Sequence, residues 1–164
     1  MIKEHLTTYY NQDWVYREIK EYFNINEVVA PKVIAKYGDE QSWSFLDFRL
    51  LSNLLYIRKG INKSITVNHG TYIQRGLRSI LSKIVLNYIR KGKYYLSGHV
   101  RGTAVDFNVE NMIAEEVRYW IVQHNDKLPF KCRLEWKKNN IEISWVHMDT
   151  DYFITNPKVY KFNV

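Results

Sequence analysis

The sequence predicts a single α+β domain, with helices in the first part of the chain and antiparallel strands in the last. Apolar residues repeat at helical spacing in several early segments, whereas the last third alternates with a period of two. The chain has 164 residues, enough for one hydrophobic core. Helices followed by strands are typical of the α+β class. We interpret residues 1–21 as an N-terminal helical extension and residues 22–164 as one compact unit.

The N-terminal region predicts two helices. Asp13–Tyr22 carries apolar and aromatic residues at approximate i, i+4 spacing, which indicates an amphipathic helix. A short second helix follows, for which Asn26 is the predicted N-cap because its side chain can accept a backbone hydrogen bond. Pro31 fits just after this helix.

A longer helix is predicted from about Phe45 to Arg58, where the apolar residues form one stripe. Ser42 or Ser44 is the expected N-cap, and Gly60 is expected to end the helix. The β-branched residues between Ser64 and Val67 then predict a short strand, followed by a turn.

The clearest helical pattern lies between Leu77 and Ile89. Its apolar residues repeat at helical spacing, and we expect this stripe to pack in the core. A strand is predicted within Ser97–Val109. After it, Asn108 or Glu110 is expected to begin an amphipathic helix that runs to about His124.

A β-hairpin is predicted near the C-terminus. Cys132–Trp136 and Ile141–Trp145 both alternate with period two around the pair Asn139-Asn140, which is a strong hairpin signal. Residues 152–164 could supply a last strand, although Pro157 weakens that expectation because proline cannot donate a ladder hydrogen bond.

Charge and composition narrow the function classes. The formal net charge of +7 favours polyanionic partners such as nucleic acid, anionic membranes or an anionic cell wall. No helix-turn-helix, zinc-finger or ribonucleoprotein signature is present, so a nucleic-acid partner is not expected. The single cysteine, Cys132, excludes an internal disulfide and a cysteine-rich zinc site. Neither a membrane-inserted segment nor a secretory signal is expected, which predicts synthesis in the cytoplasm.

One motif combines a histidine with a carboxylate. It reads Ser97-x-His99-x-x-Gly102-x-Ala104-x-Asp106, and the alternation after it places Asp106 on a strand. Catalytic zinc sites use three protein ligands and keep one position open. His147, near the end of the hairpin, offers the third ligand. Together these residues predict a site with two histidines and one carboxylate.

This motif, together with Trp145-Val146-His147-Met148-Asp149, resembles the zinc D-alanyl-D-alanine carboxypeptidase and L-alanyl-D-glutamate endopeptidase family. That family has the hedgehog/DD-peptidase fold, and the chain is most similar to its short branch from bacteriophages and murein endopeptidases. Two upstream segments extend the resemblance: Val67–Arg75 is similar to the branch's "nsGyR" segment, and Phe23–Glu27 to its "hFslsE" opening. The resemblance covers roughly residues 22–150 and rests on the order of these motifs along the chain.

The resemblance implies roles for individual residues. His99, Asp106 and His147 would be the ligands of a Zn²⁺ ion, and Arg75 would face a substrate carboxylate or oxyanion.

The general base is the point at which the sequence departs from the family. Many members carry an acid three residues before the third ligand, where this chain has Ser144. The short branch often has a His-x-Asp arrangement, which His147 and Asp149 match. We therefore expect Asp149 to be the general base, with Glu142 a distant second.

These expectations define two functions. The first is a zinc peptidase that hydrolyses a peptide bond in peptidoglycan stem or cross-link peptides, produced by a phage and either released by a holin or carried in a virion. The second is a structural or wall-binding component of a phage particle that keeps the fold and lacks turnover. Ser144 at the usual acid position keeps the second open.

Overall fold

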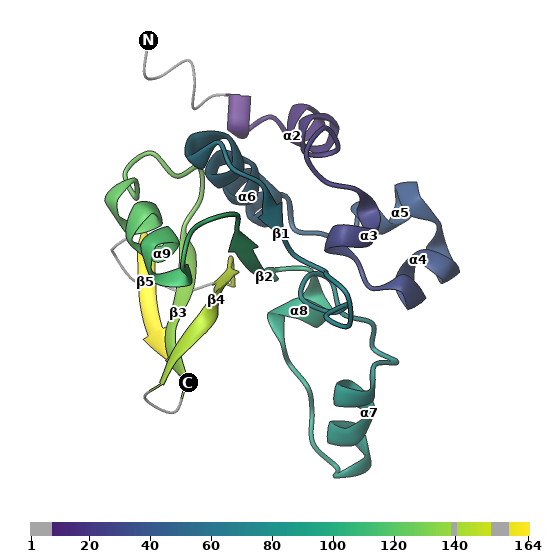
Figure 1. The fold of residues 1–164 in the computed structure, drawn as a ribbon. Helices are drawn as coiled ribbons and strands as arrows, with labels where there is room; N and C mark the ends of the chain where they lie inside the picture. Colours follow the sequence, from purple (N-terminus) through teal and green to yellow (C-terminus); the bar gives the residue numbers. More distant parts are fainter. Residues whose placement is uncertain (1–7, 139–140, 152–157) are drawn as a thin grey trace.

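The protein is an α+β domain built on one mixed sheet. The computed structural model describes residues 8–138, 141–151 and 158–164. Five strands form the sheet in the order β1-β2-β4-β3-β5, and helices are arranged around it (Figure 1). The predicted α+β class is confirmed. Among the described residues, no helix is both long and apolar enough to cross a membrane.

The helices and strands follow one another along the chain, with most of the helices first. The helices are α2 (Gln12–Ile19), α3 (Ile25–Val28), α4 (Pro31–Tyr37), α5 (Asp39–Trp43), α6 (Phe48–Ile61), α7 (Lys83–Arg90), α8 (Gly98–Arg101) and α9 (Ala114–Gln123). The strands are β1 (Ile65–Thr66), β2 (Ala104–Val109), β3 (Cys132–Lys138), β4 (Ile141–Asp149) and β5 (Val159–Asn163).

The sequence predicts an antiparallel sheet, but the sheet is mixed. The pairs β1–β2, β2–β4 and β3–β4 are antiparallel, but β5 runs parallel to β3. The reason lies in where β5 enters: it begins beside Cys132, at the end of the sheet where β3 starts and β4 finishes. The predicted strand within 152–164 is confirmed for Val159–Asn163, whereas Pro157 lies outside the described residues.

The predicted hairpin is confirmed as β3 and β4, with an irregular register. Near the turn, Lys138 pairs with Ile141 and Lys137 with Glu142. Beyond an irregularity between Glu135 and Lys137, Glu135 pairs with His147. If the pairing near the turn continued regularly, residue 144 would lie opposite Glu135. The ladder has His147 there instead, so the register shifts by three residues. Asn139 and Asn140 themselves lie outside the described residues.

One hydrophobic core lies between the sheet and the helices. The central helix α6 is amphipathic and buries leucines over its whole length, while Phe107, Leu134 and Val146 contribute from three neighbouring strands. Helix α2 packs against α6, and its buried Val15 and Ile19 belong to the same cluster. The segment predicted as an N-terminal extension therefore shares the core of the rest of the chain.

The caps of the early helices differ from the predictions. Asn24, not Asn26, caps α3, and the Glu27 carboxylate accepts a hydrogen bond from the Asn24 backbone. Pro31 begins α4 at its first position, where its missing N–H costs nothing.

The long helix α6 starts and ends about three residues later than predicted. Asp47 caps it by accepting from the backbone of Arg49 and Leu50, whereas Ser42 and Ser44 belong to the preceding helix α5 and its end. Gly60 does not end the helix but lies inside it. Glycine suits this position because a Cβ there would collide with the ring of Trp120. Asn62, in the left-handed conformation, ends it.

The helix predicted over Leu77–Ile89 is the largest error. Only Lys83–Arg90 is helical, because Leu77 forms a bridge with Val29 and the Arg78 N–H donates to the carbonyl of His99. The predicted core packing is confirmed for Leu77 and wrong for most of the stripe, since only Val85 of α7 is buried.

Helix α9 begins later than predicted because the strand before it extends further. Asn108 and Val109 belong to β2, and Ile113 is the N-cap residue, whose N–H donates to the Glu116 carboxylate.

Candidate metal centre

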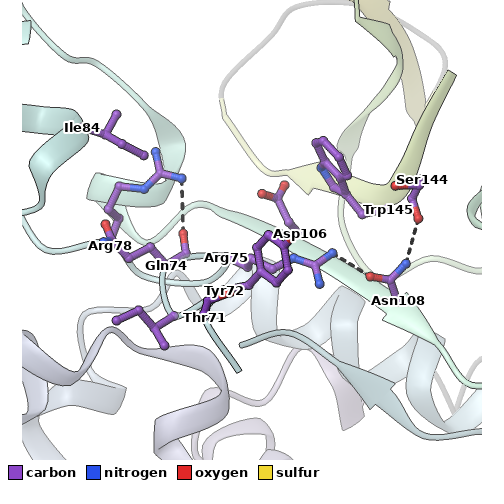
Figure 2. A pocket seen from close by; sticks show the side chains of 11 residues that line it. Thr71, Tyr72, Gln74, Arg75, Arg78, Ile84, Asp106, Asn108, Ser144 and Trp145 are labelled. Atoms are coloured by element: carbon purple, nitrogen blue, oxygen red, sulfur yellow. Dashed lines mark hydrogen bonds between the residues drawn. The ribbon is translucent and has the colours of Figure 1, made fainter. Parts of the chain in front are cut away.

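A pocket of about 480 Å³ opens beside the middle of β2 and β4 (Figure 2). It is lined by Thr71, Tyr72, Ile73, Gln74, Arg75, Arg78, Ile84, Asp106, Asn108, Ser144 and Trp145. Asp106 is the only carboxylate among these lining residues, and two arginines face the same space. The pocket therefore offers one anionic group on a positively charged and partly apolar wall.

The first predicted ligand, His99, lies on the one-turn helix α8. Ser97 caps this helix by accepting from the His99 backbone at 3.3 Å. The imidazole is buried, and its Nδ1 lies 3.0 Å from the carbonyl oxygen of Gly76. Because a carbonyl only accepts, this contact places the proton on Nδ1. The lone pair of Nε2 is therefore free to bind a metal.

Gly102 of the motif has a steric role. It ends α8 in the left-handed conformation with φ 72°, which few residues other than glycine adopt. A Cβ at this position would also collide with the carbonyl oxygen of Phe45. Ala104 follows as the first residue of β2 and is buried. The small residues thus allow the helix carrying His99 to turn directly into the strand carrying Asp106.

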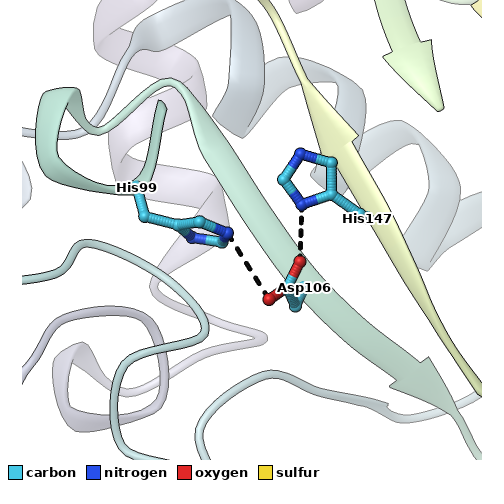
Figure 3. A group of neighbouring side chains, drawn as sticks. All are labelled: His99, Asp106 and His147. Carbon is cyan, nitrogen blue, oxygen red and sulfur yellow. Dashed lines mark hydrogen bonds and ion pairs between the residues drawn. The ribbon is translucent and has the colours of Figure 1, made fainter. Parts of the chain in front are cut away.

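Strand pairing brings Asp106 and His147 together. They are direct partners in the β2–β4 ladder, so their side chains lie on the same face. His147 Nδ1 lies 2.6 Å from Asp106 Oδ1, and His99 Nε2 lies 3.4 Å from Asp106 Oδ2 (Figure 3). The carboxylate therefore stands between the two imidazoles.

This geometry fits a metal ion. One ligand atom from each of His99, Asp106 and His147 lies within 4.8 Å of the others, and no other such group of His, Cys, Asp and Glu occurs among the described residues. Tetrahedral zinc, with bonds of about 2.0–2.1 Å, requires ligand atoms roughly 3.3–3.4 Å apart. Small side-chain adjustments would meet this requirement, so the structure supports a metal site at these three predicted residues.

Without a metal, the Asp106 carboxylate and the protonated His147 imidazole form an ion pair. Burial opposes ionisation of Asp106, but the hydrogen bond from His147 and the closeness of both imidazoles outweigh it and hold the pKa of Asp106 well below its usual range. Burial likewise opposes a charge on His147, yet its hydrogen bonds to Asp106 and Asp149 raise its pKa to about 9. Since a ligating imidazole must be neutral, metal binding has to displace a proton from His147 at neutral pH.

Asp149 lies behind His147, on the side away from Asp106. Its Oδ2 is 3.4 Å from His147 Nε2, and its Oδ1 accepts from Arg133 Nε at 2.7 Å and from the Asp151 backbone. Burial opposes ionisation of Asp149, but the hydrogen bonds from His147 and Arg133 outweigh it and lower its pKa. A carboxylate in this place fixes the ring that carries the metal-binding nitrogen.

Glu135 is a candidate that sequence reasoning missed. It is the partner of His147 in the β3–β4 ladder, so Asp106, His147 and Glu135 lie side by side on one face of three adjacent strands. Its exposed fraction is 9%, and within the described part of the chain its carboxylate has no hydrogen-bond or ion-pair partner. Glu142, in contrast, is exposed and pairs with Lys137 near the hairpin turn.

Arg75 lines the pocket next to the candidate metal centre. Its carbonyl accepts from the Asp106 N–H at 2.7 Å, and its Nη2 donates to Asn108 Oδ1 at 2.7 Å (Figure 2). Burial lowers the pKa of Arg75, and the nearby charge of Asp106 opposes that shift. The remaining N–H groups of the guanidinium can donate to an anionic group in the pocket.

Comparisons with known proteins add no identification. No protein-family model matches the chain, no curated protein is similar to it, and no solved structure matches its fold.

Proposed function

We propose that the protein is a zinc-dependent peptidase with a hedgehog/DD-peptidase-like fold that hydrolyses a peptide bond in peptidoglycan stem or cross-link peptides. The observation that carries the proposal is the convergence of His99, Asp106 and His147 beside an open pocket. The substrate class rests on the motif likeness, and the cationic wall of the pocket is consistent with it. In this proposal the enzyme is a phage product that reaches the cell wall through a holin or in a virion.

Some residues of the site would hold the metal ion, and others orient the imidazole rings that bind it. His99 Nε2, Asp106 and His147 Nδ1 would hold the ion, while the Gly76 carbonyl and Asp149 fix the two rings. When bound, zinc supplies Lewis-acid polarisation of a carbonyl and makes water acidic enough to attack near neutral pH. Arg75 donates to the developing negative charge on the substrate.

For the general base, the geometry favours Glu135 over Asp149. Both oxygens of Asp149 face partners, and its lowered pKa makes it a weak proton acceptor. The Glu135 carboxylate is beside His147 and has no partner within the described residues. We therefore assign proton transfer to Glu135 and orientation of His147 to Asp149.

Two isosteric variants test this assignment. Glu135→Gln is expected to retain zinc and to lose hydrolysis by about 10²–10⁴-fold, the usual contribution of a general base. Asp149→Asn is expected to weaken zinc binding by about 10–100-fold, as loss of an outer-shell partner typically does. Zinc content and new amines released from purified peptidoglycan are measured for both. Full hydrolysis by zinc-loaded Glu135→Gln would exclude Glu135 as the base.

The second candidate function is a wall-binding component of a phage particle without turnover. Ser144 favours it, because this residue lines the pocket where related enzymes carry an acid. Zinc-loaded protein that sediments with purified peptidoglycan and releases no new amines would establish this function in place of the first. Hydrolysis that is lost in His147→Ala and unchanged in His69→Ala would support the peptidase.

A further inference from the structure

The segment 80–96, called here the arm, exposes an unusual amount of apolar surface. It contains seven of the sixteen large hydrophobic side chains that are exposed among the described residues: Ile80, Leu81, Ile84, Tyr88, Ile89, Tyr94 and Leu96. Tyr94 and Leu96 are 91% and 78% exposed. In Figure 1 the arm carries α7 at the edge of the molecule, beyond α8. Apolar residues gathered in this way mark an interaction surface.

The arm is also strongly basic. Its exposed cations are Lys83, Arg90, Lys91 and Lys93, and it contains no acidic residue. The absence of acids extends much further, because the sequence has no Asp or Glu between Phe48 and Val105. No carboxylate neighbouring in sequence therefore neutralises the arm, and its charge is complementary to an anionic partner.

The two kinds of residue are separated around α7. Ile84 and Tyr88 are four residues apart, which places them on one side of the helix, and Leu81 is exposed just before its N-cap. Lys83 and Arg90, seven residues apart, lie on the opposite side. A short helix with a basic side, an apolar side and flanking tyrosines has the features of a segment that lies in a membrane interface.

Other partners fit this surface less well. A symmetric contact with a second copy would bring the four cations of one arm against the same cations of the other. Nucleic acid uses cations with aromatic rings that stack on bases, whereas most of the apolar residues here are aliphatic. Aliphatic side chains beside lysines and arginines match the acyl and headgroup layers of an anionic bilayer.

We propose that the arm docks the protein on the surface of an anionic lipid bilayer, with its isoleucines, leucines and tyrosines in the interface and its cations at the headgroups. The arm lies on the membrane and does not span it. The proposal is independent of the metal centre and of the reaction proposed for it.

Vesicle sedimentation tests the apolar contribution. The full chain is mixed with vesicles of phosphatidylcholine alone or of an equal mixture with phosphatidylglycerol, and the bound fraction is measured. The unchanged protein is expected to bind only the anionic vesicles. A triple variant of exposed arm residues is expected to bind about tenfold or more weakly, because less apolar surface enters the interface: Ile89→Ser, Tyr94→Ser and Leu96→Ser. The matched control changes exposed residues elsewhere: Ile113→Ser, Ile141→Ser and Val164→Ser.

A second pair of variants tests the charges. Each cation near an anionic surface contributes roughly a fivefold gain in affinity, so removing three should weaken binding about a hundredfold. The arm variant combines Arg90→Gln, Lys91→Gln and Lys93→Gln. Its control has the same loss of charge at exposed positions outside the arm and should bind nearly as well as the unchanged protein: Arg17→Gln, Lys127→Gln and Lys138→Gln.

Three results would overturn the proposal. One is no sedimentation with anionic vesicles at low salt. Another is equal weakening by the arm and control variants, which would reduce the effect to net charge. The third is a dimer in sedimentation velocity that only the apolar arm variant dissociates, which would assign the surface to a second copy. All of the changed side chains are exposed, and circular dichroism checks that each variant is folded.

Discussion

The metal centre and the arm differ in which side chains they bury and which they expose. At the metal centre, charged side chains are buried and almost every polar atom has a partner, as the chain Arg133–Asp149–His147–Asp106 illustrates. On the arm, apolar side chains are exposed and the cations have no acids beside them in sequence. The first region needs other strands to hold it, whereas the second meets the rest of the protein through a few side chains, such as the buried Val85 and Ile84 at the pocket. Substitutions should therefore act on metal binding and folding in the first region and on neither in the second.

Removal of a ligand should give the largest effect. His99→Ala is expected to lower zinc affinity by more than the roughly 10–100-fold typical for a residue that only orients a ligand, because a direct bond to the metal is lost. His69→Ala, on an exposed turn, is the matched control and should leave affinity unchanged. Competition with a chromogenic chelator measures both. Equal zinc affinity in the two variants would contradict the assignment of His99 as a ligand.

Two leucines compare packing in the two regions. Leu134→Ala in β3 should lower the free energy of unfolding by about 2–5 kcal/mol, because the side chain is fully buried. Leu96→Ala on the arm should change it by no more than about 0.5 kcal/mol. Urea unfolding followed by circular dichroism gives both values. A cost above about 2 kcal/mol for Leu96→Ala would mean that the arm packs on the core.

The ion pair of the metal-free site predicts a pH dependence. The pKa of His147 is about 9 in the folded protein and about 6.5 in the unfolded chain. Its stabilising contribution, on the order of 1–3 kcal/mol, is complete below about pH 6.5 and is lost as the pH rises through about 9. Asp106 acts in the opposite direction: its lowered pKa stabilises above about pH 4, and this contribution is lost as the pH falls.

Thermal unfolding with a chelator present, measured from neutral to alkaline pH, checks the histidine contribution. The unfolding temperature should fall as the pH rises, and His147→Gln should flatten that part of the profile. A temperature that rises with pH, or an unchanged slope in the variant, would contradict the ion pair.

Two helix caps should give the smallest and most local difference. Asp47 caps α6 in the core, and Ser82 caps α7 on the arm. Each change to alanine removes about 1 kcal/mol of helix stability. For Asp47→Ala the loss should appear in the global free energy of unfolding, whereas Ser82→Ala should only speed amide exchange in Lys83–Arg90. A global loss in Ser82→Ala would show that α7 unfolds together with the core.

The motif and the hairpin could be predicted because each depends on short-range chemistry. Gly102 and Ala104 allow a helix turn to enter a strand, and the alternation on both sides of Asn139-Asn140 specifies a hairpin. The sequence motifs predict that His99, Asp106 and His147 lie together, and the structure places them together.

The sequence did not determine which surfaces find a partner. In a regular hairpin Glu135 would pair with Ser144, and only the three-residue shift in register brings it beside His147. A hydrophobic stripe at helical spacing specifies a face on α7, but a face is buried only where another element lies opposite. Among the described residues of α7, Val85 is buried, whereas Ile84, Tyr88 and Ile89 are exposed. Local periodicity is a property of a few consecutive residues, whereas register and burial depend on contacts between segments far apart in the chain. For this reason the candidate ligands could be predicted from the sequence, while the place of Glu135 beside His147, the parallel strand β5 and the exposed arm required the tertiary structure.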